Sequence, residues 1–455
     1  MLKDKSTDSK KALSNVEDIY ELTYIQQGNL TDYLTEEKEG LFHENLVFVF
    51  QGIIDISIFQ ECWKECISRH SILRTGFYYK NLKKATQVVF KEAELPFEYV
   101  DWSDCAVEEG IDRLSYILEK DKECRYEMEK APLMRMQLFR CSDEKYLFSW
   151  RFHHIIMDGW AFVIVLADFL ELYRKRIGIT MKGILSAGYP FKEYVQYRKL
   201  RDITDERRFW SEYLKDLKKQ SPLTGIRISR PEYNKIKHGR LDCSLREYYP
   251  GLMKVIKENM LNLNSVFQGI YALLISRFSD GATDIVTGQI AADRPLALPA
   301  SESRVGLFVN TVPVRCLIYE NLNFSDWAKE IQTSMLQVFQ YAASSEREIK
   351  EWIELETEEK LFENILVFKN IPIDDDPFAG LPFHLVETSL ESHPNYPFQL
   401  FIWPDENLEF KFIYNTDTYN EEGILLFLGE FKKLLKFWIE EPCITIKRLM
   451  KKMEE

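Results

Sequence analysis

A strand, a short loop and a long apolar helix follow one another directly between residues 146 and 173, and this succession constrains the fold more than any other segment. Residues 146–152 read Tyr-Leu-Phe-Ser-Trp-Arg-Phe, a run of the kind that forms strands. Residues 160–173 have the length and the apolar density of a helix packed on a sheet. The loop between them covers residues 153–159. This succession predicts a layered α/β architecture.

Strand and helix patterns mix throughout both halves of the chain, and no low-complexity linker separates them. The three glycines between residues 175 and 190 mark the best candidate for a boundary. We therefore predict a disordered tail at 1–12, an N-terminal α/β lobe at 13–180 and a C-terminal α/β lobe at 181–455. Further strands are predicted at 45–51, 87–90, 285–290, 362–368 and 408–414, and helices near 59–67, 111–118, 266–278 and 425–438.

The composition excludes several classes of protein. Of 455 residues, 45% are hydrophobic, which is too many for a disordered chain. The chain carries 59 Lys and Arg against 72 Asp and Glu, a net charge of −13, which argues against a nucleic-acid partner. The strongest apolar run, residues 160–167, is far shorter than the roughly 18–20 residues that a bilayer requires. We expect no membrane association and a cytoplasmic location.

The eight cysteines are scattered, and none forms a CxxC pair. Cys62 and Cys66 share a helical face, but two further ligands with suitable spacing are missing for a zinc site. The pattern is typical of reduced thiols in a cytoplasmic protein.

Two adjacent histidines stand at the end of the strand at 146–152. Residues 153–159 read His-His-Ile-Ile-Met-Asp-Gly, in a chain with only seven histidines. Because neighbouring strand residues point to opposite faces, either His153 or His154 can face the interior while the other faces a cavity. A neutral imidazole can accept or orient a proton at neutral pH. Asp158 is placed to pair with a cation and hold the loop, and Gly159 to allow a turn that other residues resist.

Three uses of these residues stay open from their spacing alone. The sequence lacks a Walker loop, a GxGxxG turn after a strand, an HExxH helix and a GxSxG elbow. The histidine pair can serve catalysis, form a structural pair with satisfied hydrogen bonds, or bind a metal together with Asp158. The metal interpretation is the weakest, because no further histidine or acid cluster stands out nearby.

Residues 153–159 match the HHxxxDG motif, and the chain resembles the condensation domains of nonribosomal peptide synthetases. Residues 305–315, Val-Gly-Leu-Phe-Val-Asn-Thr-Val-Pro-Val-Arg, are similar to the family's VGxFxNTxPxR motif. Residues 69–75 resemble its RHxxLRT motif, residues 22–28 its opening motif, and residues 361–370 its LFDxxxVFEN strand. The matches keep the family's order from about residue 18 to 440. HHxxxDG also occurs in related acyltransferases, so the combination carries the resemblance.

Three segments depart from the family pattern. Residues 293–295 read Asp-Arg-Pro, with Asp in place of Gly. Residues 341–345 lack the usual aromatic-Pro-Leu element, and residues 395–398 read Asn-Tyr-Pro-Phe. The resemblance places the last two segments along the active-site tunnel, so the specificity for substrate stays open.

The resemblance implies an α/β (α+β) fold of two lobes like chloramphenicol acetyltransferase, joined in a V-shaped pseudo-dimer with a central tunnel. It implies a reaction in which the amine of an acceptor aminoacyl thioester attacks a donor acyl or peptidyl thioester to form a peptide bond. Upstream donor and downstream acceptor carrier proteins would present these groups on 4'-phosphopantetheine. The enzyme would bind no cofactor or metal of its own, would neighbour an adenylation domain, and would act as a monomer.

The resemblance also assigns roles to residues. His154 becomes the catalytic histidine, which removes a proton from the amine or orients it and stabilises the tetrahedral intermediate. His153 becomes its structural partner, and Asp158 forms an ion pair for which Arg294 is the proposed partner. Gly159 leaves space for the pantetheine thioester, and Asn310 helps to position groups in the cleft. Arg69 and Arg74 are predicted to be structural. The basic runs at 83–84 and 174–176 are candidate carrier-docking surfaces, but solvated surface charge is the favoured interpretation of both.

Rival functions differ in the nucleophile or in the chemistry. A stand-alone or terminal acyltransferase would join the donor to a free amine or alcohol. An epimerisation domain carries an EGHGRE-type segment, whereas this chain reads Lys-His-Gly-Arg at 237–240 and keeps VGLFVNT. A heterocyclisation domain replaces the histidine pair with an Asp-based motif. A non-catalytic module that recruits carriers disagrees with the intact His154, Asp158 and Gly159.

Overall fold

Two compact units, each with its own core, make up the chain in its computed structural model. The expected tail at 1–12 lies outside the described residues. Unit 1 contains the described residues within 14–201, 294–308 and 376–392, and unit 2 contains those within 202–293, 309–369 and 396–453. The structure describes residues 14–36, 40–104, 107–217, 223–227, 238–356, 359–369, 376–392 and 396–453.

Unit 1 is built on a five-stranded sheet in the order β12-β2-β7-β6-β5, as far as the described residues show. Neighbouring strands are antiparallel except β5 and β6, which are parallel. Its strands are β2 (His43–Gly52), β5 (Phe97–Asp101), β6 (Met134–Arg140), β7 (Lys145–His153) and β12 (Phe383–Ser392). A smaller sheet in the order β1-β4-β3 comprises β1 (Val16–Glu21), β3 (Thr75–Tyr78) and β4 (Thr86–Phe90).

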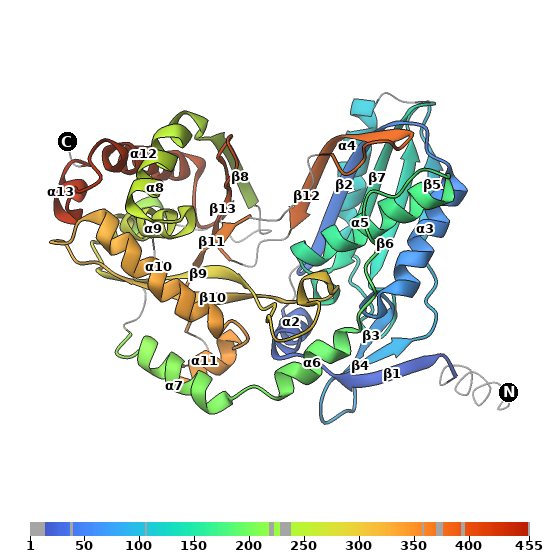
Figure 1. The fold of residues 1–455 in the computed structure, drawn as a ribbon, viewed down its shortest axis with the longest axis horizontal. Coiled ribbons are helices and arrows are strands. Elements are labelled where there is room, and N and C mark those ends of the chain that lie inside the picture. The colour runs from blue at the N-terminus through green and yellow to red at the C-terminus, as the bar shows by residue number, and fades with distance from the viewer. Residues whose placement is uncertain are drawn as a thin grey trace. The chain divides into compact units, whose positions relative to one another are not determined.

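Helices cover both faces of the five-stranded sheet. Even-numbered residues of β7, such as Phe148 and Trp150, pack against α3 (Ile56–Arg69) and α5 (Gly159–Arg176), which Figure 1 shows beside this sheet. Leu147, one residue along, packs instead with Leu114 of α4 (Val107–Asp121) on the other face. The period of two in β7 therefore separates the two cores. The remaining α-helices among the described residues of unit 1 are α2 (Tyr24–Thr35) and α6 (Phe191–Lys199).

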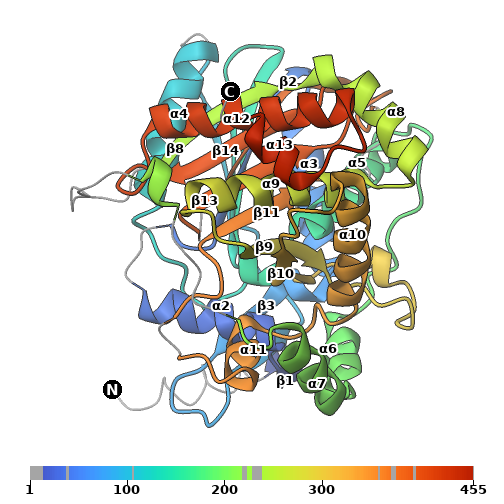
Figure 2. The same cartoon turned by 90° about the vertical axis from the view of Figure 1, so that its left-hand side faces the viewer.

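Unit 2 is built on a sheet in the order β10-β9-β11-β13-β14-β8. Phe267 and Tyr271 of its central helix pack against Phe431 and Phe427 of the long C-terminal helix. Figure 2 shows α9, α10, α12 and α13 on the viewer's side of this sheet. The strands are β8 (His238–Ser244), β9 (Asp284–Ala292), β10 (Val309–Leu317), β11 (Asn364–Phe368), β13 (Phe398–Trp403) and β14 (Glu409–Asn415). The helices are α7 (Ile203–Tyr213), α8 (Tyr249–Asn259), α9 (Leu263–Phe278), α10 (Phe324–Gln340), α11 (Glu346–Trp352), α12 (Glu421–Glu440) and α13 (Ile446–Lys451).

The structure confirms the mixed α/β class and every strand and helix predicted above, with ends that differ by a few residues. The glycine-containing stretch at 175–190 is not where the chain first passes between the units; that passage falls between Arg201 and Asp202. The lobe boundary at 180 and the V-shaped pairing stay predictions. None of the helices in the described part of the chain has the length and apolar character needed to cross a bilayer.

Candidate active site

The loop that carries the two histidines leaves the end of β7 and enters α5 after one short helical turn. His153 is the last residue of β7, and His154 opens the turn η2 (His154–Ile156). The backbone N–H of His154 donates to the carbonyl of Phe42 over 2.8 Å. The N–H of His153 donates to Leu133 over 3.0 Å. The loop is therefore anchored on both sides of β7 before the first functional side chain appears.

His153 is a fully buried, neutral residue. Its Nδ1 accepts the N–H of Ile155 over 3.1 Å and so caps the turn that follows. Its ring lies edge-on to Tyr33 at 4.5 Å and near Tyr126 and His43. Burial, reinforced by His43, His154 and Arg125, holds the pKa of His153 well below its usual value. The expected role of structural partner agrees with this environment.

His154 is only half-buried, and one ring nitrogen is already committed. Its Nδ1 lies 3.0 Å from the carbonyl oxygen of Met157. A carbonyl can only accept, so Nδ1 carries the proton in this contact, and in the neutral form of an imidazole held in this way Nε2 is the unprotonated nitrogen. The structure records no hydrogen bond to Nε2 from another described residue. The arrangement presents a fixed imidazole with one open proton-accepting atom.

Asp158 ties the loop to the segment that precedes β10. Its Oδ1 accepts the N–H groups of Trp160 and Ala161 over 3.0 and 2.8 Å, so it caps the N-terminus of α5. Its Oδ2 accepts the N–H of Phe308 over 2.8 Å, and its own N–H donates to Gly306 over 3.2 Å. A carboxylate at this end of a helix is also favoured by the helix dipole.

Arg294 forms the ion pair expected with Asp158. Nη2 of Arg294 lies 3.5 Å from Oδ1 of Asp158, and both side chains are buried. Nη1 donates to the carbonyls of Ser301 and Arg304 over 2.7 and 3.0 Å, and the guanidinium lies 4.1 Å from the ring centre of Phe308. Removing one partner of such a pair leaves a buried charge and costs roughly 3–5 kcal/mol. The pair fixes the loop without touching His154.

The turn role expected for Gly159 is wrong. Gly159 is the first residue of α5 and is not among the glycines with positive φ. Its backbone therefore adopts a conformation that other residues also adopt. The space that it leaves for a pantetheine thioester stays a prediction.

Asn310 belongs to unit 2, whereas the other predicted site residues belong to unit 1. Its Nδ2 donates to the carbonyls of Ala342 and Ser344 over 2.9 and 2.7 Å. Both amide N–H groups are thus spent on the turn after α10, which is the segment that departs from the family pattern. A role for Asn310 in positioning substrate stays a prediction.

Comparisons with known proteins agree on one family. The family model described as "Condensation domain" matches residues 16–454. The chain belongs to the condensation domain family. Members of this family are acyltransferases that form amide bonds in nonribosomal peptide synthesis, without a resident cofactor, on substrates carried by phosphopantetheine. They work beside carrier and adenylation domains.

Three relatives illustrate the similarity of this condensation domain. One of the proteins that make up the linear gramicidin synthase of Brevibacillus parabrevis is 29% identical over 442 residues, which is 95% of this chain and 9% of that protein. The condensation domain of the Monacolin K polyketide synthase MokA has a TM-score of 0.78 at 15% identity, covering 95% of this chain and 100% of that one. The four-domain synthetase AB3403, bound to AMP and glycine, has a TM-score of 0.77 at 17% identity, covering 95% of this chain and 34% of that one. The chain thus spans about a tenth of the length of the gramicidin synthase protein.

Several residues that support the loop of this condensation domain were not found from the sequence. Gln26 of α2 donates to the carbonyl of Ile155 over 3.2 Å, across a separation of 129 residues. Gly306 leaves no room for a side chain, because a Cβ there would lie 2.2 Å from the ring of Phe191. Arg304 is buried and pairs with Glu193 over 2.6 Å. Motif matching indicated residues 22–28 and 305–308, but no local pattern showed which atoms these residues contact.

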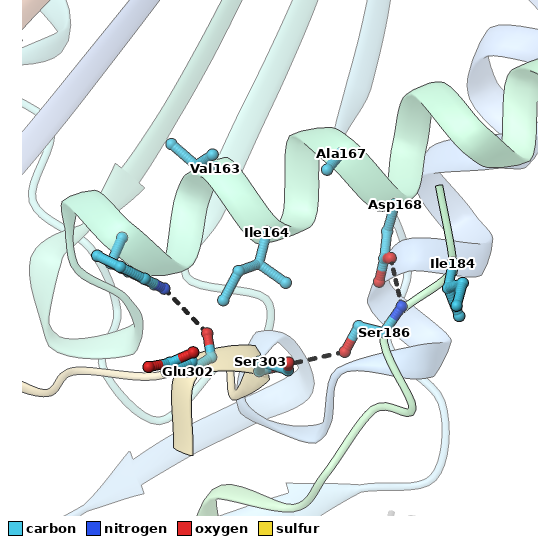
Figure 3. Close-up of a pocket in the computed structure, with 9 residues that line it drawn as sticks. Val163, Ile164, Ala167, Asp168, Ile184, Ser186, Glu302 and Ser303 are labelled. Carbon is cyan, nitrogen blue, oxygen red and sulfur yellow. Dashed lines mark hydrogen bonds between the residues drawn. The ribbon is translucent and has the colours of Figure 1, made fainter. Parts of the chain in front are cut away.

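A pocket of about 220 Å³ opens on α5 beyond Trp160, and Figure 3 shows its lining. Nε1 of Trp160 donates to the carbonyl of Glu302 over 2.9 Å, and Oγ of Ser186 donates to the carbonyl of Ser303 over 3.2 Å. The Trp160 contact holds the segment that carries Phe308 against α5, and the Ser186 contact holds it against the stretch that follows α5. The lining residues are Trp160, Val163, Ile164, Ala167, Asp168, Ile184, Ser186, Glu302 and Ser303.

Of the basic residues considered for carrier docking, Arg174 is buried, whereas Lys83, Lys84, Lys175 and Arg176 are exposed. Arg174 is 1% exposed and binds Glu171 over 2.7 Å and the carbonyls of residues 377 and 379. Arg176 pairs with Glu65, and Lys84 lies 3.6 Å from Glu21. The expectation for Arg174 is therefore wrong, because a buried, paired guanidinium cannot meet a partner.

The remaining site predictions concern Arg69, Arg74 and a metal. Arg69 donates to the carbonyl of Ser186 over 2.9 Å, and Arg74 pairs with Glu17, so both hold elements of unit 1 together. Within the described ranges, no group of three or more His, Cys, Asp or Glu side chains is arranged to hold a metal ion.

Proposed function

We propose that this condensation domain joins a donor acyl or peptidyl thioester to the amine of an acceptor aminoacyl thioester. The hydrogen bond of His154 carries the proposal. Its Nδ1–H donates to the carbonyl of Met157, so its Nε2 stays available to accept a proton. Nε2 accepts a hydrogen bond from the attacking amine, orients it, and takes its proton as the C–N bond forms. Collapse of the tetrahedral intermediate breaks the C–S bond, and the donor arm leaves as a thiol when the sulfur takes that proton.

The protein needs few catalytic groups for this reaction. A thioester is an activated acyl donor, and two tethered substrates held in register gain rate through proximity and orientation. The precision of the site then rests on the groups that immobilise the loop. Asp158, held by three N–H groups and Arg294, supports this interpretation, because it fixes the loop and leaves the reacting atoms to His154.

The partners follow from the substrates. We propose that separate donor and acceptor carrier proteins deliver both thioesters on phosphopantetheine, and that an adenylation domain loads the acceptor. The family relationship to parts of large synthetases supports this assignment. The cysteines among the described residues form no disulfide, which supports a reducing, cytoplasmic location.

The test uses intact mass of the carriers. The purified chain is mixed with acyl-loaded donor carriers, aminoacyl-loaded acceptor carriers and, separately, free amines. A new amide on the acceptor carrier is the expected product. Product with free amines alone would identify the chain as an acyltransferase for free nucleophiles, and epimerised substrate without condensation would identify an epimerisation domain.

The matching variant is His154→Ala. We expect a rate at least about 100-fold lower than wild type, because general acid–base catalysis and orientation contribute 10²–10⁴-fold, with an unchanged thermal midpoint. His384→Ala is the control, because His384 is exposed on β12 and touches none of the loop. Wild-type turnover by His154→Ala would overturn the role of Nε2.

A further inference from the structure

The peptide groups next to His154 are held from two directions. The N–H of Ile155 donates to Nδ1 of His153, and the carbonyl of Ile155 accepts from Nε2 of Gln26 over 3.2 Å. The N–H of His154 donates to Phe42. His153 is the last residue of β7 and Phe42 directly precedes β2, whereas Gln26 makes its contact from α2.

Gln26 is a completely buried amide whose four hydrogen-bonding positions are all filled. Its two N–H groups meet the carbonyls of Ile155 and of the Gln87 side chain. Its Oε1 accepts from the side-chain amide of Gln87 over 3.0 Å and from the N–H of Thr23 over 3.1 Å. An amide is the side chain that supplies two donors and two acceptors in this way. A full set of bonds in a buried site fixes both its position and its orientation.

Gln87 and Thr23 in turn anchor Gln26 to rigid elements. Gln87 lies on β4 and also donates to the carbonyl of Glu21 over 3.1 Å. Thr23 and Gln26 form a reciprocal capping box at the start of α2. The carbonyl of Ile155 is therefore tied to the smaller sheet and to a capped helix end through one side chain.

We infer that Gln26 is a positioning residue for the condensation reaction, which holds the loop so that Nε2 of His154 meets the attacking amine. The inference rests on the proposed function. Gln26 does not contact the imidazole, so it acts through the backbone of Ile155. A reaction that depends on orientation is sensitive to a displacement of about 1 Å, which can cost about 100-fold in rate.

Two substitutions separate the effect of hydrogen-bond donation by Gln26 from the effect of filling its buried site. Gln26→Met keeps the approximate volume and removes all four hydrogen bonds. Gln26→Glu keeps the acceptor toward Thr23 and Gln87 but has no N–H for Ile155. Gln268→Met is the matched control, because Gln268 is an equally buried amide on α9 of unit 2 whose Nε2 donates to Thr287 and Cys316.

We expect kcat to fall about 10- to 100-fold in both Gln26 variants while KM for each carrier stays within about threefold, since orientation rather than binding is lost. Gln268→Met should lose stability but keep kcat per folded molecule. A fall of kcat in Gln26→Met no larger than that in Gln268→Met would overturn the inference, as would full activity of Gln26→Glu.

A double-mutant cycle shows whether Gln26 acts through His154. In the His154→Ala background, Gln26→Met should cause no further loss, because the group that it positions is gone. A loss as large as in the wild-type background would assign Gln26 another role and overturn the inference.

A spectroscopic readout separates this inference from the proposed function. The imidazole signals of ¹⁵N-histidine-labelled protein are assigned to His154 by comparison with His154→Ala. Gln26→Met should shift or broaden the His154 signals, and Gln268→Met should leave them in place. Unchanged His154 signals in Gln26→Met would overturn the inference, whether or not the chain forms an amide. If the chain forms no amide but the signals shift, the proposed function fails while the positioning of His154 by Gln26 is supported.

Discussion

The adjacent histidines of the loop have opposite environments. His153 is buried and uses Nδ1 to cap the turn, whereas His154 is half-buried and keeps Nε2 open. A neutral His153 is required for this, because a protonated Nδ1 could not accept the N–H of Ile155. A low pKa at His153 thus keeps its Nδ1 able to accept the N–H of Ile155, and this bond holds the turn that carries His154.

His43 shares this neutral environment with His153. It lies opposite His153 in the pairing of β2 with β7, and its ring is 4.8 Å from that of Tyr126. Burial, with smaller contributions from Arg135, Arg125 and Arg151, lowers the pKa of His43 to about 4. Its Nε2 has no hydrogen-bond partner in the described structure, so an apolar side chain in its place would break no bond.

The lowered pKa values make the stability of unit 1 depend on pH. Between pH 6.5 and about 4 the unfolded chain binds more protons than the folded one at His43, so the free energy of unfolding falls as the pH falls. We expect His43→Leu to lessen this fall by up to about 2 kcal/mol between pH 6.5 and about 5, measured by urea unfolding at both values. His384→Gln, at an exposed histidine, should keep the wild-type slope. Equal slopes in wild type and His43→Leu would contradict the prediction.

Predictions of contacts between single residues were confirmed where family motifs contain both residues of the contact. His154, Asp158 and Arg294 each lie in or beside a family motif, and the Asp158–Arg294 pair was found from it. The contact of Gln26 with Ile155 and the pairing of His43 with His153 could not be found in this way, because each joins residues more than 100 positions apart in the sequence. Gly159 was misjudged because a glycine after Asp also suits the first turn of a helix.

Helices and strands with a clear apolar pattern could be predicted from the sequence, whereas the order in which they pack could not. The strand β14 and the helices α3 and α12 follow from periods of two and 3.6 residues, whereas β7 and α5 follow from their length and apolar or aromatic composition. The pairing of β12 with β2, over more than 330 residues of sequence, leaves no local trace. The segment 294–308 likewise has few regular elements, yet it carries Arg294, Gly306 and the N–H of Phe308 to Asp158.

The close approach of this segment to α6 predicts a steric effect. A Cβ on Gly306 would lie 2.2 and 2.4 Å from two ring carbons of Phe191, so Gly306→Ala must displace one of the two elements. We expect a loss of about 1–3 kcal/mol in the free energy of unfolding, as for overpacking in other cores. The displacement also moves Phe308, so the amide-forming rate should fall as well.

The control for Gly306→Ala is Gly429→Ala. Nothing lies within 4 Å of a Cβ built on Gly429, which is an exposed residue of α12. Alanine there should raise the free energy of unfolding by up to about 1 kcal/mol through helix propensity. A Gly306→Ala variant as stable as Gly429→Ala would contradict the prediction, because it would show that the segment 294–308 can move away from Phe191 without lowering the free energy of unfolding.

On the scale of the whole molecule, the two units are interleaved along the chain. Unit 1 takes its residues from three separate stretches, and so does unit 2. Local patterns along a sequence locate a boundary where composition changes, and they cannot show that a strand or segment returns to an earlier unit. The mixed α/β class was therefore predictable, and the order in which the chain visits the units was not.

This interleaving predicts that the N-terminal lobe, as bounded at 13–180, will not fold alone. The fragment lacks β12, which pairs with β2 from Gly52 to Glu44, and it lacks Arg294 and Phe308, which bind Asp158. Its sheet would expose the edge of β2, and Asp158 would lose its buried cation. We expect a non-cooperative thermal melt and rapid proteolysis, compared with a cooperative melt for the full chain. A fragment of 13–201 joined by Gly/Ser linkers to 294–308 and 376–392 restores these partners and should recover cooperativity, whereas a cooperative melt of 13–180 at the midpoint of the full chain would contradict the prediction.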